Sequence, residues 1–396
     1  MIFAAGMRHS FFALLVFFWA LFAVYSYAFL DVNLTLSSWN IYQSVQQSLF
    51  QLGYFQRNIS AGIYVMFLII LFGLYIFALR LVLANKLSEK AIWKISSLVS
   101  GILVFAYPAF SHDIFNYMFY GRIITLYQGN PYTLRALDFP DDLWVRFMRW
   151  THGVAPYGVV LLALTVVPSF FGFGKFIPTL LFFKLLMFGG YILCLYSLRR
   201  ILRVVAPSFV NVGLVLFGLN PLVLVEGIVN GHNDLVFMGF ALLGLAFLLE
   251  KRMLWAWVFL MLSIGTKYAT AAFVLPFFLI QRLHLAWSNM WWMLLGLMML
   301  AVVIASMGIY NRGSTGGEFL PWYLLWPICI AVLRPQEKMV WWMVVSFSLG
   351  GLLYYVPYIL TGVYTDEVKI WRMFFVYMPA IFVLVSLFVL RWKHEK

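Results

Sequence analysis

The stretch from Ser60 to Leu83 reads SAGIYVMFLIILFGLYIFALRLVL, and its only charged residue is Arg80, close to the end. An α-helix needs about 20 predominantly apolar residues to cross the hydrocarbon core of a bilayer. This stretch meets that length without an acidic residue. It therefore predicts a transmembrane helix and, with it, a membrane protein.

The composition of the whole chain agrees with that prediction. Of its 396 residues, 64% are hydrophobic, 20% aromatic and only 10% charged, and the mean hydropathy is +0.93. A soluble domain is about half apolar and a quarter charged. The chain lacks the polar surface that a soluble enzyme, a nucleic-acid-binding domain or a disordered protein needs, so no nucleic-acid partner is expected. The net charge of +13 becomes a question of which side of the membrane the basic residues occupy.

Apolar runs of similar length recur along the chain. The first run, 11–30, could be a signal peptide, but its length favours a retained transmembrane span. The run 254–283 is read as two short helices broken around Lys267, with one long tilted helix as the alternative. We therefore expect an all-α, polytopic membrane protein with about 11–13 transmembrane helices. The candidate spans are 11–30, 60–83, 93–110, 175–198, 209–228, 235–250, 254–266, 268–283, 288–307, 320–333, 340–360 and 372–391.

The charges between these spans predict the topology. With the N-terminus inside and the apolar run 157–171 not crossing, most Lys and Arg fall on the inner side and most Asp and Glu on the outer side, as the positive-inside rule requires. If 157–171 crossed, the cluster Arg199, Arg200 and Arg203 would move outside. We therefore expect a surface-lying or re-entrant helix at 157–171. The map predicts a multi-pass plasma (inner) membrane protein with both termini cytoplasmic.

The long outer loop from Ser111 to about Ala155 is the expected place for chemistry, because long loops are uncommon unless they are functional. If the start of this loop is helical, Asp113 would share one face with Asn116, Tyr117 and Tyr120. A partly desolvated carboxylate among such groups can act as a general base. An N-cap role for Asp113 is the equally weighted alternative.

Two further outer segments carry polar residues. Gly129-Asn130-Pro131-Tyr132 is turn chemistry. Asn230-Gly231-His232-Asn233-Asp234 lies between two apolar spans, where polar groups need partners or water. His232 and Asp234 could bind a metal, hold a phosphate through a cation or orient a sugar hydroxyl; a short loop capped by Asp234 is the alternative.

Isolated basic residues are the candidates for binding phosphate. Lys267 lies in an apolar stretch, which makes it a functional candidate by default, although it could snorkel to the interface. Arg312 and Arg372 lie on the outer side, and arginine matches phosphate oxygens in bidentate fashion. Trp322 and Tyr323 could be belt residues or line a lipid groove. The two cysteines, Cys194 and Cys329, lie in apolar runs and indicate buried thiols rather than a disulfide or zinc site.

The ordered set of these motifs resembles the GT-C membrane glycosyltransferases. It is most similar to the prokaryotic polyprenyl-phosphate-mannose-dependent mannosyltransferases, which are related to the GPI-anchor mannosyltransferase. The resemblance rests on Ser-His-Asp-Ile-Phe-Asn-Tyr from Ser111, Gly-Asn-Pro-Tyr at 129–132, Ala-Pro-Tyr-Gly at 155–158, Asn220-Pro221, Gly-His-Asn-Asp at 231–234, Lys267 and Pro-Trp-Tyr-Leu-Leu-Trp at 321–326. It implies a conserved module at 93–283 with a catalytic loop at 111–155. Residues 1–92 look like added N-terminal helices and 284–396 like a variable C-terminal module.

The resemblance also implies a function: transfer of a sugar, mannose by this likeness, from a polyprenyl-phosphate donor to an extracytoplasmic glycan or glycolipid acceptor. Asp113 would be the general base of an inverting reaction. No cofactor is implied with certainty, although a divalent cation fits the chemistry. A transporter or flippase of a lipid-linked sugar and a polysaccharide polymerase or ligase remain as alternatives. The implied substrate-binding residues are His112, Asn116, Tyr117, Arg122, Asn130, Tyr132, Tyr157, His232, Asn233, Asp234, Lys267, Arg312, Trp322, Tyr323 and Arg372.

Overall fold

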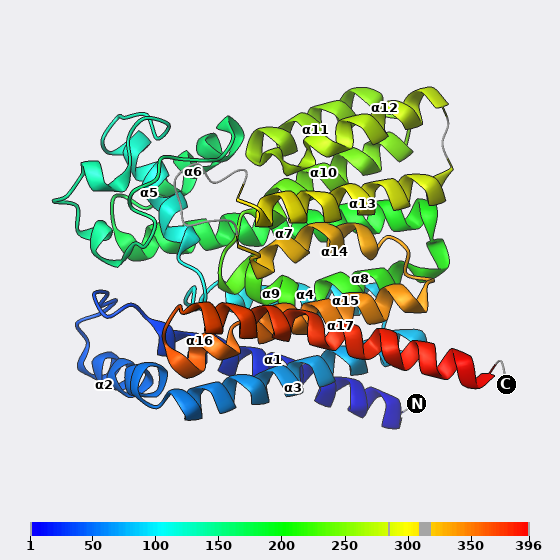
Figure 1. The fold of residues 1–396 in the computed structure, drawn as a ribbon, viewed down its shortest axis with the longest axis horizontal. Coiled ribbons are helices and arrows are strands. Elements are labelled where there is room, and N and C mark those ends of the chain that lie inside the picture. The colour runs from blue at the N-terminus through cyan, green and yellow to red at the C-terminus, as the bar shows by residue number, and fades with distance from the viewer. Residues whose placement is uncertain (1, 284–285, 309–317, 395–396) are drawn as a thin grey trace.

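The structure is a computed structural model that describes residues 2–283, 286–308 and 318–394. Within those ranges the chain is built from helices and contains no strand (Figure 1). The helices before the long outer loop are α1 (Ile2–Ser26), α2 (Asn40–Phe50), α3 (Arg57–Leu83) and α4 (Glu89–Leu103). The helices that follow are α5 (Asp113–Thr125), α6 (Val159–Phe171), α7 (Phe176–Val205), α8 (Val210–Gly218), α9 (Pro221–Leu224), α10 (Asp234–Leu249), α11 (Met253–Thr266), α12 (Val274–Leu283), α13 (Trp287–Ser306), α14 (Leu325–Ala331), α15 (Lys338–Leu353), α16 (Val356–Thr361) and α17 (Asp366–His394).

These helices follow the predicted spans closely. By length and apolar character, 6 described helices can cross a membrane, and a pair bent by 52° between Pro207–Gly218 and Pro221–Val229 makes up to 7. The shorter apolar helices, of 10–17 residues, are Val159–Phe171, Asp234–Leu249, Met253–Thr266, Tyr268–Leu283 and Pro321–Ala331. The all-α polytopic class is therefore confirmed. The expected total of about 11–13 crossings stays a prediction, because it counts most of these short helices as spans.

Two local predictions concern helix breaks and short helices. The break expected at Lys267 is present: the residue has extended backbone, with φ −149° and ψ 130°, between α11 and the 3-10 helix η7 (Tyr268–Phe273). The run 157–171 forms the 13-residue helix α6, which at about 1.5 Å per residue is too short to cross hydrocarbon about 30 Å thick. Helix α2, with no buried residue, was not predicted, because its polar sequence lacks a long apolar run.

The long helices run roughly parallel to one another, with the start of α1 and the end of α17 at one end of the bundle (Figure 1). Helices α2, α5 and α6 lie at the other end. At the end that holds the termini, Glu89 at the start of α4 pairs with Arg199 and Arg203 near the end of α7. Arg200 pairs with Glu250, just after α10. The predicted map put all these residues on one side, and their contacts agree with it.

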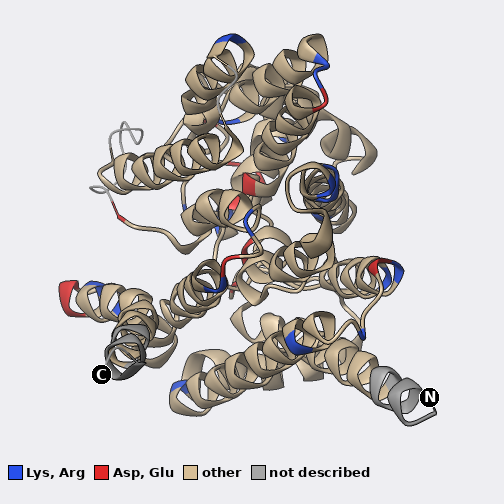
Figure 2. Cartoon of the chain, turned by 90° about the vertical axis from the view of Figure 1, so that its right-hand side faces the viewer, with Lys and Arg blue, Asp and Glu red and all other residues tan. Residues whose placement is uncertain are grey.

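Figure 2 looks at the end of the bundle that holds the termini and shows how few charges the helices carry. Lys and Arg gather at helix ends, whereas some acidic residues lie in the interior. Helix α10 is buried on nearly every side, as expected for a helix that is apolar all round. It packs closely on α7, where a Cβ added to Gly190 would lie 2.9 Å from the backbone nitrogen of Val236. Small residues allow such close helix contacts in membranes.

Candidate active site

Asp113 is the first residue of α5 and does not cap it. The N-cap position belongs to His112, which makes no side-chain capping bond, and the Asp113 backbone N–H donates to Ser111 Oγ at 3.3 Å. The capping alternative is therefore not realised. The Asp113 side chain is 17% exposed, so its carboxylate is largely desolvated and still reachable.

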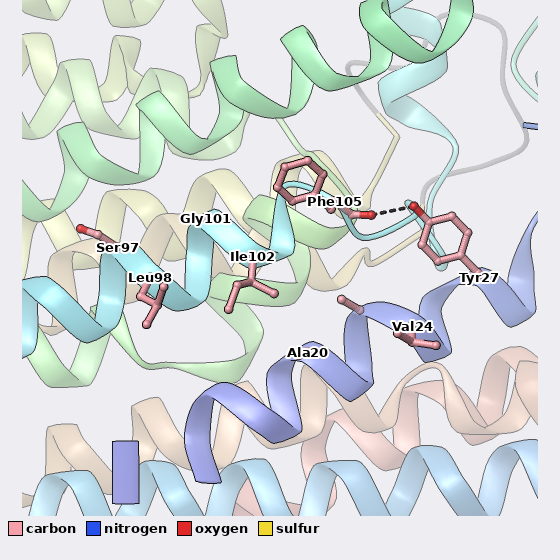
Figure 3. Close-up of a pocket in the computed structure, with 9 residues that line it drawn as sticks. Ala20, Val24, Tyr27, Ser97, Leu98, Gly101, Ile102 and Phe105 are labelled. Carbon is pink, nitrogen blue, oxygen red and sulfur yellow. Dashed lines mark hydrogen bonds between the residues drawn. The ribbon is translucent and has the colours of Figure 1, made fainter. Parts of the chain in front are cut away.

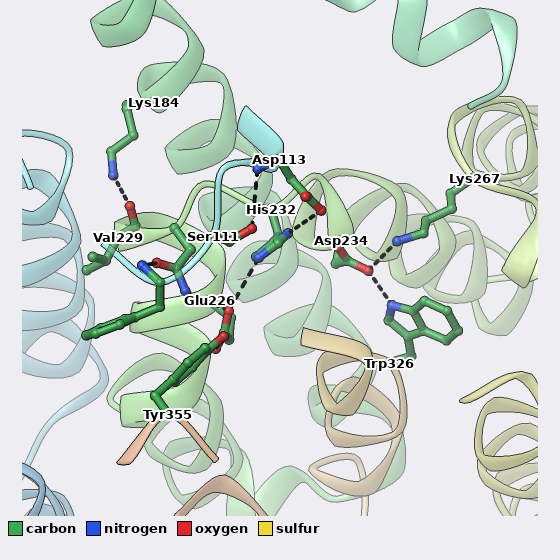
Figure 4. Close-up of polar contacts among 12 residues, drawn as sticks. Ser111, Asp113, Lys184, Glu226, Val229, His232, Asp234, Lys267, Trp326 and Tyr355 are labelled. Carbon is green, nitrogen blue, oxygen red and sulfur yellow. Dashed lines mark hydrogen bonds and ion pairs between the residues drawn. The ribbon is translucent and has the colours of Figure 1, made fainter. Parts of the chain in front are cut away.

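His232 lies between two carboxyl groups (Figure 4). Its Nδ1 is 3.6 Å from Asp113 Oδ2, and its Nε2 is 3.5 Å from Glu226 Oε2. The imidazole is fully buried and stacks on the Trp322 ring, with centroids 3.9 Å apart and an interplanar angle of 21°. Glu226 also accepts hydrogen bonds from Asn230 Nδ2 and the Tyr355 hydroxyl, each at 2.8 Å. Segments far apart in the sequence thus meet at one imidazole.

Burial sets the protonation of this group of residues. It raises the pKa of Asp113 to about 6; Lys267 nearby opposes the rise and Asp234 adds to it. Burial, followed by the charge of Lys267, lowers the pKa of His232 well below its ordinary value. At neutral pH the site therefore contains an ionised Asp113 beside a neutral imidazole. That is the pair of charge states a general base and its hydrogen-bonding neighbour require.

Asp234 and Lys267 form a second unit beside this one. Lys267 Nζ lies 2.8 Å from Asp234 Oδ1, and the Trp326 indole N–H donates to the same oxygen. The ammonium lies 5.0 Å from the Trp326 ring centroid, 5.5 Å from that of Phe237 and 5.8 Å from that of Tyr323. Lys267 therefore lies among aromatic rings and beside an acidic side chain instead of snorkelling.

Several buried polar atoms around this centre lie outside hydrogen-bond distance of any partner in the described part of the chain. Among the described residues they include both nitrogens of His232, both amide atoms of Asn233, Oδ2 of Asp234 and Oδ1 of Asn116. Buried polar groups are rarely left without partners, and each exception calls for an explanation. A substrate rich in hydroxyl groups would satisfy donors and acceptors of this mixed kind.

The predicted Ala155–Gly158 motif joins the outer loop to the Lys267 break. The Gly158 N–H donates to the Thr266 carbonyl at 3.2 Å, and a Cβ added to Gly158 would lie 2.1 Å from the carbonyl oxygen of Gly265. Only a glycine permits this approach. Tyr157 next to it makes an edge contact with Tyr117, with centroids 5.3 Å apart.

Other predicted residues of the outer loop hold the loop itself together. Arg122 pairs with buried Asp142 and lies 4.3 Å from the Trp144 ring. Asn130 Oδ1 accepts from the Tyr132 N–H at 3.0 Å, as expected for a turn. Three predicted residues bond to backbone carbonyls through their side chains. Tyr132 Oη donates to the Tyr157 carbonyl at 2.9 Å, and Asn116 Nδ2 donates to the Trp150 carbonyl at 2.9 Å. His112 Nδ1 lies 3.1 Å from the Phe147 carbonyl.

The predicted residues of the C-terminal part are divided between two places. Trp322 and Tyr323 reach the His232 and Lys267 units and are buried there. Arg372 instead pairs with Glu318 at 2.8 Å, with its guanidinium 3.7 Å from the Tyr354 ring centroid. Its cation is thus already neutralised by a carboxylate. Arg312 lies outside the described residues.

Two buried charged residues were not among the predicted site residues. Glu226 lies in the π-helix η6 (Val225–Val229), and Lys184 lies in α7; both are fully buried. Lys184 Nζ donates to the carbonyls of Ile228 and Val229, the latter at 2.6 Å. A charge within an apolar run is itself a functional signal in a membrane protein, so the sequence does mark both residues. Apart from Asn230, which follows Glu226 by four positions, their partners come from distant segments that the sequence does not pair.

An apolar groove of about 550 Å³ lies elsewhere, between α1 and α4 (Figure 3). It is lined by Ala20, Ala23, Val24, Tyr27, Ser97, Leu98, Gly101, Ile102 and Phe105. None of these residues contributes to the Asp113 and His232 cluster. Trp322 and Tyr323, which were expected to line a lipid groove or an interface belt, are not part of it.

Comparison with known proteins identifies the family. Residues 32–284 match the family described as alpha-(1->6)-mannopyranosyltransferase, N-terminal domain. The chain belongs to this family. The matched region contains Asp113, Glu226, His232, Asp234 and Lys267. No solved structure matches the chain significantly. Among the described residues, no group of three or more His, Cys, Asp or Glu side chains is arranged to hold a metal ion.

Two curated relatives carry the same description. The chain is 25% identical over 203 residues to alpha-(1->6)-mannopyranosyltransferase A of Mycobacterium tuberculosis, which covers 50% of the chain and 38% of the relative. It is 27% identical over 189 residues to the protein of that name from Corynebacterium glutamicum, covering 46% of the chain and 37% of the relative. The aligned part of the chain thus spans less than two fifths of either relative.

Proposed function

We propose that this chain is a mannosyltransferase that moves mannose from a polyprenyl-phosphate donor to an extracytoplasmic glycan or glycolipid acceptor. The observation that carries the proposal is the partly exposed Asp113 carboxylate beside His232, with the Lys267 ammonium among the charges that act on it. The names of the family and of both relatives support the class of reaction. The active site would face the outside, with both termini in the cytoplasm.

In the proposed reaction, Asp113 takes the proton of an acceptor hydroxyl while that oxygen attacks the anomeric carbon of the donor. The bond from that carbon to the phosphate oxygen breaks on the opposite face, so the configuration inverts. A β-linked donor then gives an α-linked product, the configuration in the relatives' names. The leaving phosphate needs cations rather than an acid. Lys267, whose charge acts on Asp113, is the first candidate; Arg312, and Arg372 if it exchanges Glu318 for the phosphate, are the others.

The residues around Asp113 would bind the sugars. Asn233, His232 and Asp234 carry the unpartnered polar atoms that hydroxyl groups can satisfy, and Tyr117 and Tyr157 form an aromatic wall beside them. Residues 93–283 would form the catalytic module, to which 1–92 and 284–396 add helices. His112, Asn116, Arg122, Asn130 and Tyr132 would keep the outer loop in place above the donor.

The test is sugar transfer by purified protein in lipid nanodiscs, supplied with radiolabelled polyprenyl-phosphate mannose and a mixture of mannosyl acceptors. Asp113→Asn removes the base with little change in size. Asp138→Asn is the matched control, because Asp138 lies in the same loop and its ion-pair partner among the described residues is exposed Arg135. We expect the loss of Asp113 to abolish transfer and the control to keep it. Full transfer by a folded Asp113→Asn protein contradicts the proposal.

A second donor separates the proposed enzyme from the alternatives. A polymerase or ligase would consume a diphosphate-linked oligosaccharide and ignore the monophosphate. A flippase would move the labelled lipid across a vesicle membrane without forming a glycosidic bond. We expect label to reach the acceptor from the monophosphate donor alone. Transport without transfer, or use of the diphosphate donor alone, would refute the proposed function.

A further inference from the structure

We propose that Glu226 is a positioning residue of this reaction: acting through His232, it holds an imidazole N–H against the Asp113 carboxylate. The inference rests on the proposed function and extends it to a residue buried in the bundle. Glu226 cannot itself reach a substrate at Asp113, because the His232 ring lies between the two carboxyl groups (Figure 4). Its effect must therefore pass through the imidazole.

Glu226 is held in place by its own partners. Its side chain is fully buried, and each oxygen receives a hydrogen bond of 2.8 Å, one from Asn230 and one from Tyr355. The Asn230 side-chain oxygen in turn accepts from the Phe110 N–H at 3.1 Å, three residues before Asp113. A carboxyl group in an apolar bundle is costly to bury, so a residue fixed this firmly indicates a function beyond packing.

His232 is constrained in two different ways. The stacked Trp322 ring, 3.9 Å away, fixes the plane of the imidazole. Stacking leaves the ring free to turn within that plane, and Glu226 at Nε2 fixes this remaining direction. In a neutral imidazole, the hydrogen bond made by one nitrogen decides which nitrogen carries the proton. A protonated Glu226 carboxyl that donates to Nε2 keeps the imidazole proton on Nδ1, where it can be donated to Asp113.

The distances leave room for this arrangement to tighten. Contacts of 3.5 and 3.6 Å are longer than a hydrogen bond, and catalytic hydrogen bonds are often long before the substrate is bound. A hydrogen bond donated to an ionised carboxylate favours the charged form. When the bond forms, Asp113 remains ionised and oriented toward the acceptor hydroxyl.

The test compares Glu226→Leu with Glu226→Gln. Leucine cannot hydrogen-bond to His232, so we expect kcat to fall about 100-fold, the effect of misplacing a reacting group by roughly 1 Å, with the KM for the donor unchanged. Glutamine keeps a hydrogen-bonding group at Nε2 and is expected to retain most of kcat. Ser348→Ala is the control, because it removes a buried 2.8 Å bond to Asn220 away from this chain of contacts.

The pH profile of kcat distinguishes positioning from packing. If His232 stops donating to Asp113, the ionised carboxylate loses a stabilising partner, so the acid limb moves to higher pH in Glu226→Leu. The acid limb of the pH profile should not move in Ser348→Ala or Glu226→Gln. The other titratable groups whose charges act on Asp113 or feel its charge stay in place in all three variants: Asp234, Lys267, Tyr117, Tyr120, Tyr157 and Tyr323. Glu226, which also feels the charge of Asp113, is retained in Ser348→Ala.

A milder variant keeps the inference testable if Glu226→Leu does not fold. Tyr355→Phe leaves Glu226 in place and removes one of its two donors, so a smaller shift of the acid limb in the same direction supports the proposal. An unshifted limb in Tyr355→Phe and in folded Glu226→Leu overturns it. If Asp113→Asn is inactive while Glu226→Leu has the kcat and pH profile of the unmutated protein, only the positioning role is refuted. A fully active Asp113→Asn refutes the proposed function itself.

Discussion

Replacing Lys267 with methionine should destabilise the fold, because it leaves a buried carboxylate without its cation. Asp234 is fully buried, whereas the Lys267 side chain is 19% exposed. In Lys267→Met, Asp234 Oδ1 keeps only the Trp326 N–H, and Oδ2 has no partner among the described residues. Methionine is about as long as lysine and fits the aromatic surroundings, so the lost charge is the main change.

The magnitude follows from the burial of the pair. Removing one partner of a buried ion pair costs about 3–5 kcal/mol. Because water reaches part of Lys267, and because Trp326 still donates, we expect the low end, about 3 kcal/mol. Adding Asp234→Asn removes the stranded charge. The double variant should therefore regain about 2 kcal/mol of that loss, as expected for directly coupled residues.

The measurement is the free energy of unfolding in mixed micelles, titrated with dodecyl sulfate, for the wild type, both single variants and the double variant. The four values form a double-mutant cycle, and its coupling energy isolates the pair from general packing changes. Additive losses, with the double variant at the sum of the singles, would contradict the reasoning, as would a Lys267→Met protein as stable as the wild type.

Four more predictions concern the outer loop and its junction with the Lys267 break. Activity should fall tenfold per pH unit below a pH of about 6, because burial raises the pKa of Asp113 to about 6 and the protonated form is no base; the pH profile of kcat measures this. Asp113→Asn should also be more stable than the wild type at pH 7.5, since a raised carboxyl pKa means that ionisation above it destabilises the fold; thermal unfolding checks this. Arg122→Ala should expose the loop to proteolysis, because buried Asp142 loses its cation and keeps the Tyr127 hydroxyl and the Trp144 N–H, a loss of about 3 kcal/mol. Gly158→Ala should displace the Gly265 carbonyl and lower kcat, measured with the mannose donor.

Each of these four predictions has an outcome that would contradict it. A flat pH profile down to pH 5, or an Asp113→Asn protein less stable than the wild type at pH 7.5, would refute the electrostatic account of Asp113. Unchanged proteolysis of Arg122→Ala, compared with Arg135→Ala at an exposed pair, would show that the loop does not depend on Asp142. Wild-type kcat in Gly158→Ala would mean that the backbone can relax without cost.

The fold was predictable where the bilayer requires long apolar helices. Long apolar runs gave nearly every helix, and the charge asymmetry indicated that 157–171 does not cross. The sequence predicted the break at Lys267 because a cation interrupts an apolar run. Helix α2 escaped prediction, because a polar helix of 11 residues has no composition that distinguishes it from a loop.

The candidate site was predictable as a set of residues but not as a geometry. Asp113, His232 and Lys267 stood out because polar residues are rare in so apolar a chain. Nothing in the sequence states that Trp322 stacks on His232 or that Tyr355 reaches Glu226, since these contacts depend on how distant helices pack. Arg122 was expected to bind substrate because Asp142, 20 positions later, gave no sign of being its partner.

Lys184 has a consequence for how the protein enters the membrane. A lysine near the centre of a transmembrane helix opposes insertion by about 2.5–3.5 kcal/mol, and this one has no carboxylate among its described hydrogen-bond partners, only the carbonyls of Ile228 and Val229. Those carbonyls belong to a later segment of the chain. Helix α7 therefore reaches the lipid before the groups that receive its ammonium have been made, and its stable insertion should wait for synthesis to pass Val229. Biogenesis of the inner bundle is thus expected to be cooperative, with α7 and the bent segment after it leaving the translocon together.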